Sequence, residues 1–248
     1  MPKIEHALGA FKTISLHDMD RVALLSRTDT KFMVQKGQVA DILDALKDEY
    51  RVLEIDDNRI STYESLYYDT ADFYFYLMHH NGRARRAKVR KRSYIDADLS
   101  FIEVKKKDGK GNTHKFRKPI NDFKPELSVT TKQFLQDTLP MENSLLVTLK
   151  NGFKRITLVN VSAKERVTID LDLKFNAKEG KKAFDHLAII EVKQERLNRN
   201  SPMIRVLKGL GTHPERISKY CLGMASLYEE LKYNRFKQKF LRIHKLTL

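Results

Sequence analysis

Cysteine is almost absent from this sequence, which contains only Cys221 in 248 residues. A single thiol cannot close an internal disulfide bond, and it excludes a cysteine-based zinc cluster. We therefore expect a protein from a reducing compartment. Cys221 lies in an apolar helical pattern near the C-terminus, which favours a packing role for its side chain over a role as nucleophile.

Tryptophan is absent as well, and tyrosine and phenylalanine gather between residues 63 and 76, away from the most basic stretches. Proteins that bind single-stranded nucleic acid present aromatic rings on which the bases stack. The sequence shows no such platform, so no nucleic-acid partner is expected.

Long apolar runs are also missing. No segment approaches the roughly 20 apolar residues that span a bilayer, and residues 1–10 lack the hydrophobic region of a signal peptide. These absences predict a cytoplasmic protein without a transmembrane segment. The length is sufficient to bury a core, and we expect a single domain over residues 1–248, with its core at about 27–232 and a basic tail at 233–248.

Positive charge is abundant. Lysine and arginine together number 47 against 32 aspartate and glutamate residues, which gives a formal net charge of +15. Such an excess indicates a polyanionic partner. Nucleic acid, membrane lipid and polyphosphate all satisfy this requirement, so the charge alone does not choose among them.

Residues 88–118 predict three consecutive strands in which basic side chains recur at every second position. Because alternate residues of a strand point to the same side, the three strands share one basic face. Its seven cations are Lys88, Arg90, Arg92, Lys105, Lys107, Lys115 and Arg117. Like charges on paired strands destabilise a sheet, so we expect an anion to bind this face.

The tetrapeptide Ile-Glu-Val-Lys occurs twice, ending at Lys105 and at Lys193. Each copy places a carboxylate and an ammonium on one strand face, which suggests a cavity with cations for phosphates and a carboxylate for a metal. A solvated, salt-bridged outer face is the alternative, but repetition over four or more strands favours the cavity. In the alternating run 164–175, Asp170 and Asp172 share the face of Arg166, either as metal ligands or as ion-pair partners of the cations.

About eight mostly antiparallel strands predict an α+β fold, in which a closed β-barrel has helices packed on its outside. The charged strand faces then line the lumen, which for about eight strands has room for side chains or one small ligand. Helices are expected at about 15–25, 39–46, 127–139, 201–209 and 218–232. For the tail at 233–248, a packed or frayed C-terminal helix is favoured over binding to a membrane surface or a partner.

Seven motifs, taken in order, resemble the vacuolar transporter chaperone (VTC) domain, a polyphosphate-polymerase branch of the CYTH-like triphosphate tunnel metalloenzymes. The resemblance runs from about Arg27 to Tyr228. The motifs are Arg27-x-Asp-x-Lys-Phe32, Tyr67-Tyr-Asp-Thr70, Lys88-Val-Arg-Lys-Arg-Ser-Tyr94, Phe101-Ile-Glu-Val-Lys105, Glu165-Arg-Val-Thr-Ile-Asp170, Ile190-Glu-Val-Lys193 and Ser218-Lys-Tyr-Cys221.

The resemblance implies an eight-stranded antiparallel tunnel that binds a triphosphate or a polyphosphate chain together with Mn²⁺ or Mg²⁺. The residues implied in catalysis are Arg90, Arg92, Lys105, Arg166 and Lys193. Further implied phosphate contacts are Lys31, Lys88, Lys115, Arg117, Ser218 and Lys219. Glu191 is the implied principal metal ligand, and Glu103 is a second metal ligand or an ion-pair partner.

The expected activity is that of an ATP:polyphosphate phosphotransferase. ATP would lie in the tunnel and pass its γ-phosphoryl group to the terminal phosphate of a growing chain. This reaction needs positioning and neutralisation of charge, and it needs no protein nucleophile. The alternatives are a tunnel-type triphosphatase acting on inorganic triphosphate or nucleoside triphosphates, and a non-catalytic module that binds polyphosphate.

Two departures from the wider superfamily bear on this expectation. Many relatives begin with Glu-x-Glu-x-Lys where this chain has Arg27, Asp29 and Lys31, which leaves fewer carboxylates for a metal. Eukaryotic polymerase relatives also carry a phosphate-sensing domain and transmembrane segments that this sequence does not contain. Translocation of a product would therefore require a membrane-protein partner.

Overall fold

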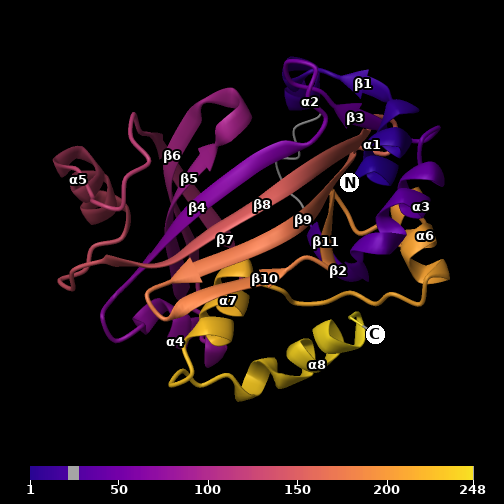
Figure 1. Ribbon diagram of the computed structural model, residues 1–248. Helices are drawn as coiled ribbons and strands as arrows, with labels where there is room; N and C mark the ends of the chain where they lie inside the picture. Colours follow the sequence, from indigo (N-terminus) through magenta and orange to yellow (C-terminus); the bar gives the residue numbers. More distant parts are fainter. Residues whose placement is uncertain (22–27, 248) are drawn as a thin grey trace.

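A computed structural model describes residues 1–21 and 28–247 of the chain. Arg27 lies outside the described residues, as do the last four residues, 22–25, of the helix expected at 15–25. Figure 1 shows a strongly curved sheet with helices around it. The main path of the sheet contains β2 (Thr28–Gln35), β4 (Ser61–Asp69), β5 (Arg86–Tyr94), β6 (Leu99–Lys107), β7 (Thr113–Pro119), β8 (Leu146–Asn160), β9 (Glu165–Ala177) and β11 (Leu187–Gln194).

These eight strands pair in the order β2-β11-β9-β8-β4-β5-β6-β7, and every pair is antiparallel. The short strands β1 (Lys12–Ile14), β3 (Arg51–Leu53) and β10 (Gly180–Phe184) lie off this path. The antiparallel tunnel fold with helices outside is therefore confirmed. Within residues 1–21 and 28–247, the path ends at β2 and β7, and no ladder of hydrogen bonds joins these two strands.

The helices largely follow the predicted periodicity. They are α1 (Pro2–Gly9), α2 (Leu16–Arg21), α3 (Val39–Asp44), α4 (Tyr74–His80), α5 (Val129–Thr138), α6 (Pro202–Gly209), α7 (Lys219–Leu227) and α8 (Lys237–Lys245). Ser128, Ser201 and Ser218 cap α5, α6 and α7, each through a side chain that accepts a backbone N–H. The helix expected at 218–232 ends at Leu227, five residues early, and α1 was not predicted.

Most of the apolar side chains of the sheet face outward, where helices cover them. Val167 and Ile169 of β9 and Ile190 and Val192 of β11 pack in one cluster with α1, α3 and α6. A second cluster joins strands β4, β5 and β6 to Leu135 of α5. The residues that alternate with these apolar positions therefore point to the inner face of the curved sheet.

Helix α7 covers one end of that inner face. Inward-pointing apolar residues of six strands form a cluster with it, and Leu149, Phe175 and Met224 are among its members. Gly223 makes this close approach feasible, because a Cβ at that position would lie 2.5 Å from a ring carbon of Phe175 and 2.6 Å from a methyl carbon of Leu149. The inner space is therefore apolar and filled at this end, and charged toward the other.

Replacing Gly223 by alanine should lower the free energy of unfolding by about 1–3 kcal/mol, because the added methyl group overpacks this cluster. Denaturant unfolding measures the change. Gly209→Ala is the matched control, since nothing lies within 4 Å of a Cβ there, and alanine is the better helix former. Equal stability of Gly223→Ala and the wild-type protein would contradict the close packing of α7.

A β-bulge in β9 separates the charged part of the inner face from the apolar part. Lys154 pairs with Leu171 and Gly152 pairs with Lys174, so two residues of β9 face one residue of β8. Asp172, inside the bulge, has a φ of +53°, and its carboxylate pairs with Lys36. The expectation that Asp172 shares the face of Asp170 and Arg166 is therefore wrong, because the bulge interrupts the alternation between them.

Asp69 connects the end of β4 to two helices. Its buried carboxylate accepts the backbone N–H groups of Thr70 and Phe75 at 2.8 Å and of Tyr76 at 2.9 Å. The hydroxyl of Tyr220 in α7 donates to the same carboxylate. Asp69 thus holds the start of α4 against α7.

The basic tail forms a packed helix. Ile243 of α8 is buried in the cluster that contains α7, and Phe236 and Phe240 pack against it. Nε of Arg242 lies 3.5 Å from Oε1 of Glu215. Of the two forms of C-terminal helix expected from the sequence, packed or frayed, the structure shows the packed one. Cys221 is likewise buried in this cluster.

Candidate functional site

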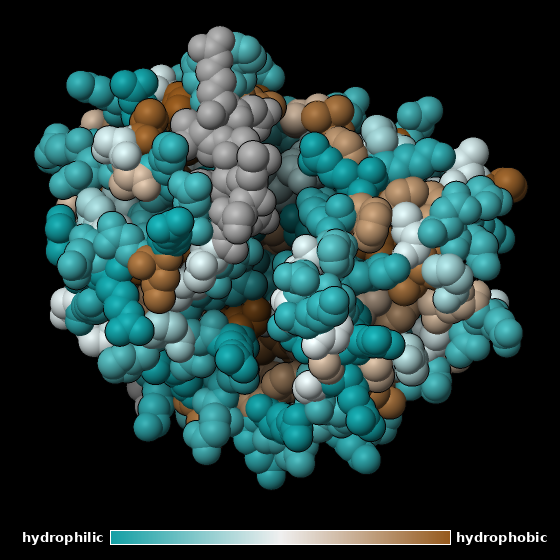
Figure 2. Space-filling model, turned by 180° about the vertical axis from the view of Figure 1, so that it is seen from behind, coloured by the Kyte–Doolittle hydropathy of each residue, from teal (hydrophilic) through white to brown (hydrophobic). Residues whose placement is uncertain are grey.

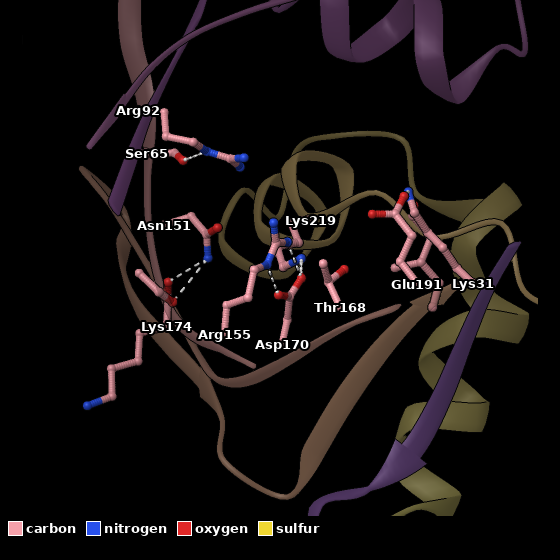
Figure 3. Close-up of polar contacts among 12 residues, drawn as sticks. Lys31, Ser65, Arg92, Asn151, Arg155, Thr168, Asp170, Lys174, Glu191 and Lys219 are labelled. Carbon is pink, nitrogen blue, oxygen red and sulfur yellow. Dashed lines mark hydrogen bonds and ion pairs between the residues drawn. The ribbon is translucent and has the colours of Figure 1, made fainter. Parts of the chain in front are cut away.

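The strand register brings the predicted residues together on the inner face. Lys88 is opposite Lys105, and Arg90 is opposite Glu103. Across the sheet, Glu191 is opposite both Lys31 and Thr168, and Lys193 is opposite Arg166. Residues directly opposite on paired strands point to the same side. In Figure 3 the charged side chains surround a common space, with the helix that carries Lys219 behind them.

Glu103 forms the first of three similar carboxylate contacts. Its Oε2 lies 2.7 Å from Nε of Arg90, and its Oε1 lies 2.5 Å from Nζ of Lys115. Burial opposes ionisation of this carboxyl, but Arg90, Arg92 and Lys115 together lower its pKa to about 2. Glu103 is therefore a carboxylate at neutral pH, and it joins cations from β5 and β7.

Glu191 of β11 forms the second contact. Its Oε2 lies 2.6 Å from Nζ of Lys193, and its Oε1 lies 3.4 Å from Nζ of Lys31. Burial alone would raise the pKa of Glu191, but Lys193 and Lys31 hold it well below its ordinary value. This carboxylate joins cations from β11 and β2.

Asp170 forms the third contact. Arg155 binds it through two nitrogens, with Nε 2.6 Å from Oδ1 and Nη2 2.8 Å from Oδ2. The ammonium of Lys219 also pairs with Oδ2. Of the two roles open to Asp170, metal ligand or ion-pair partner, the described structure shows the ion pair. Arg155 was not among the predicted site residues, because its role depends on the register between β8 and β9.

The start of α7 supplies two more groups. The hydroxyl of Ser218 accepts a hydrogen bond of 2.8 Å from Nζ of Lys88, and it also accepts the backbone N–H of Cys221 as the cap of α7. Burial lowers the pKa of Lys88. The structure thus brings Ser218 and Lys219 to the inner face, as the resemblance implies.

The remaining predicted residues differ in exposure. Arg92 is buried, and its Nε lies 3.3 Å from Oγ of Ser65. Lys105 is exposed. Arg117 lies on β7, whose residues are all exposed, and its guanidinium carbon is 4.9 Å from the ring centre of Phe101. The predicted cations therefore extend from the buried inner face to an exposed edge strand.

Seen from behind, the surface is mostly hydrophilic and has a recess near its centre (Figure 2). Polar side chains lie on both sides of this recess.

The family model of the VTC domain matches residues 26–228. This chain belongs to the VTC domain family. A comparison with curated proteins found no match. None of the helices in residues 1–21 and 28–247 has the length and apolar character needed to cross a membrane.

Two solved structures resemble this VTC domain over most of its length. A candidate adenylate cyclase from Bacillus halodurans has 12% identity, covers 86% of this chain and 97% of its own chain, and gives a TM-score of 0.51. A candidate adenylyl cyclase from Hippeastrum, described as having a dominant triphosphatase activity, has 14% identity over 80% of this chain and 95% of its own, with a TM-score of 0.49. The first of these similarities supports the tunnel fold.

The carboxylates of the VTC domain fit a metal that binds together with its substrate. Mg²⁺ is commonly held by one or two carboxylates, several waters and substrate phosphates. Glu191 and Glu103 could supply the carboxylates, since both have lowered pKa values. Among the described residues, no group of three or more His, Cys, Asp or Glu side chains is arranged to hold a metal ion. Phosphate oxygens and water would therefore have to complete the coordination shell.

Lys193 should make phosphate binding depend on pH. Burial lowers the pKa of its ammonium to about 8, although Glu191 acts in the opposite direction. A bound phosphate favours the protonated form. Below about pH 8 the free protein already holds this proton, whereas above it the proton must be taken up on binding. The affinity for ATP should therefore fall as the pH rises above 8, by up to about tenfold per pH unit.

Calorimetric titration with ATP between pH 7 and 9.5 measures this dependence. Lys193→Arg is the control, because the guanidinium stays charged over the whole range. The affinity of this variant should fall less than that of wild type over this range. If wild type and Lys193→Arg lost affinity in parallel, the titrating group would not be Lys193.

Proposed function

We propose that this VTC domain is a metal-dependent polyphosphate polymerase, which transfers the γ-phosphoryl group of ATP to the end of a polyphosphate chain. The observation that carries this proposal is the set of three carboxylates, Glu103, Asp170 and Glu191, each of which contacts two cations from different elements. The six cations lie along one inner face, so they could bind several phosphate groups at once rather than one.

The residues of this face supply what phosphoryl transfer requires. Arg90, Arg92 and Arg155 offer planar guanidinium groups that can bind phosphate oxygens through two N–H donors. Lysines from β2, β11 and α7 add positive charge. A bound Mg²⁺ or Mn²⁺ would further neutralise phosphate charge. Positioning and charge neutralisation account for most of the catalysis in this class of reaction.

The protonation states favour a phosphate acceptor over water. Glu103 and Glu191 have lowered pKa values because cations surround them, and Asp170 is held well below its usual pKa by Arg155 and Lys219 although burial opposes this. Carboxylates with such low pKa values are poor general bases. The terminal oxygen of a polyphosphate chain is already anionic and needs no base, whereas an attacking water gains from one.

Incubation of the purified protein with ATP and Mn²⁺ or Mg²⁺, followed by separation of polyphosphate from free phosphate, tests this proposal. Wild type should form polyphosphate, and Glu191→Ala should form none. Lys174→Ala is the matched control, because this exposed lysine of β9 points away from the other side chains in Figure 3. It should keep full activity.

The other outcomes point to the other functions. Free phosphate without polymer would replace the polymerase by a triphosphatase. Binding of triphosphate without turnover would leave a polyphosphate-binding module. A cytoplasmic location and a membrane-protein partner for translocation remain predictions from the sequence.

A further inference from the structure

Asp170 differs from the other two carboxylates in that a single guanidinium, that of Arg155, binds both of its oxygens. Asp170 is only 1% exposed. Both oxygens accept hydrogen bonds from the guanidinium of Arg155, and one of them also contacts the ammonium of Lys219. Figure 3 shows this triad in the inner space, in front of α7. Neither cation can bind another anion fully while Asp170 holds it.

The surroundings of Asp170 carry excess positive charge. The rings of Tyr63 and Phe153 stack with their centres 5.2 Å apart. The guanidinium carbons of Arg92 and Arg155 lie within 6 Å of both ring centres, and Nζ of Lys219 lies 4.6 Å from that of Phe153. Three cations thus gather around this ring pair, and, among the residues described, Asp170 is the carboxylate that pairs with two of them.

The contacts of Asp170 are those that a phosphate group would make. Arginine binds carboxylates and phosphates with the same pair of parallel N–H donors. A carboxylate that already occupies these donors must share them or give them up when a phosphate arrives, and its charge repels the phosphate. While no phosphate is present, this carboxylate keeps Arg155 and Lys219 paired. Two buried cations without an anionic partner would destabilise the folded protein.

We propose that Asp170 is an internal competitor for phosphate, which holds Arg155 and Lys219 in place in the free protein and weakens phosphate binding at this part of the tunnel. This inference rests on the proposed function, because it requires phosphate to bind on the inner face. Asp170 thereby determines how tightly the tunnel retains a phosphate chain. A polymerase that repeatedly binds and releases phosphate groups needs such a limit on affinity.

The test compares wild type, Asp170→Asn and Asp172→Asn by calorimetric titration with inorganic tripolyphosphate in the presence of EDTA. Asp170→Asn should bind tripolyphosphate at least tenfold more tightly than wild type. Asp172→Asn removes the same charge from the same strand, but its partner is Lys36 outside the triad. This control should bind like wild type. A carboxylate that only supported the structure would give weaker binding when replaced, not tighter.

Melting temperatures give a second measurement. Without ligand, Asp170→Asn should melt below wild type, because two buried cations have lost their partner. With millimolar tripolyphosphate, its midpoint should rise by more than that of wild type. If Asp170→Asn does not fold, Asp170→Thr replaces it, since a β-branched residue suits a strand and its hydroxyl keeps one acceptor.

Two results would overturn these ideas separately. Unchanged or weaker binding by Asp170→Asn, with normal binding by wild type, would overturn the role of Asp170 as a competitor. No binding of tripolyphosphate or ATP by wild type, with or without Mg²⁺, would overturn the proposed function itself.

Discussion

Replacement of Arg90 by alanine is expected to lower kcat/KM for polyphosphate formation from ATP by about 10³-fold or more. Losses of this size follow when a positioned donor is removed from a site where charge develops in the transition state. Arg90 projects from the middle of β5, contacts Glu103 through two nitrogens and lies 3.3 Å from the hydroxyl of Tyr67. Its guanidinium is thus held at a fixed place on the inner face before substrate arrives.

Two further variants make this result specific. Arg90→Lys keeps the charge but loses the planar fork, so it should recover only part of the activity. Arg51→Ala removes an exposed arginine from β3 and should leave the rate unchanged. Circular dichroism must show that Arg90→Ala is folded. A folded Arg90→Ala protein with more than a tenth of wild-type kcat/KM would remove Arg90 from the catalytic machinery.

Replacement of Asp69 by alanine should have the largest effect on stability, with a loss of about 3–5 kcal/mol in the free energy of unfolding. The change leaves three backbone N–H groups and the hydroxyl of Tyr220 without their acceptor. Each buried donor that loses its partner costs about 1–3 kcal/mol. Both α4 and α7 would lose a contact that holds them in place, so the proposed binding of phosphate at Ser218 and Lys219 should weaken as well.

Chemical denaturation measures this loss, and Tyr220→Phe gives the comparison. That variant removes one of the four hydrogen bonds and leaves the backbone contacts intact, so it should lose only about 1 kcal/mol. A loss by Asp69→Ala no larger than that of Tyr220→Phe would mean that water replaces the carboxylate, and that Asp69 does not anchor the helices.

Strand alternation was sufficient to predict which side chains share the inner face. Each Glu-x-Lys strand has only two faces, and its apolar residues had to lie against helices, so Glu103, Lys105, Glu191 and Lys193 were assigned correctly to one side. The same reasoning failed at Asp172. A bulge inserts one residue without any change in the apolar pattern that a reader of the sequence could recognise.

Contacts between elements far apart in the chain could not be predicted from the sequence. Arg155 lies in a run that reads as a buried strand, and only its register with β9 brings it to Asp170. Lys219 reaches the same carboxylate because α7 enters the curved sheet, which helical periodicity alone does not indicate. The resemblance to the VTC domain suggested Lys219 as a phosphate contact, but it did not indicate the carboxylate that holds it.

The bulge at Asp172 also determines how far the charged part of the inner face extends along β9. Before it, Ile169 and Leu171 pack outward; after it, Leu173 and Phe175 pack inward against α7. Deletion of one residue here would exchange the two faces of the rest of β9. Lys174 and Asn176 would then point inward under α7, and Leu173 and Phe175 would point outward. A single inserted residue therefore sets the boundary between the charged part of the inner face and the apolar part that α7 covers.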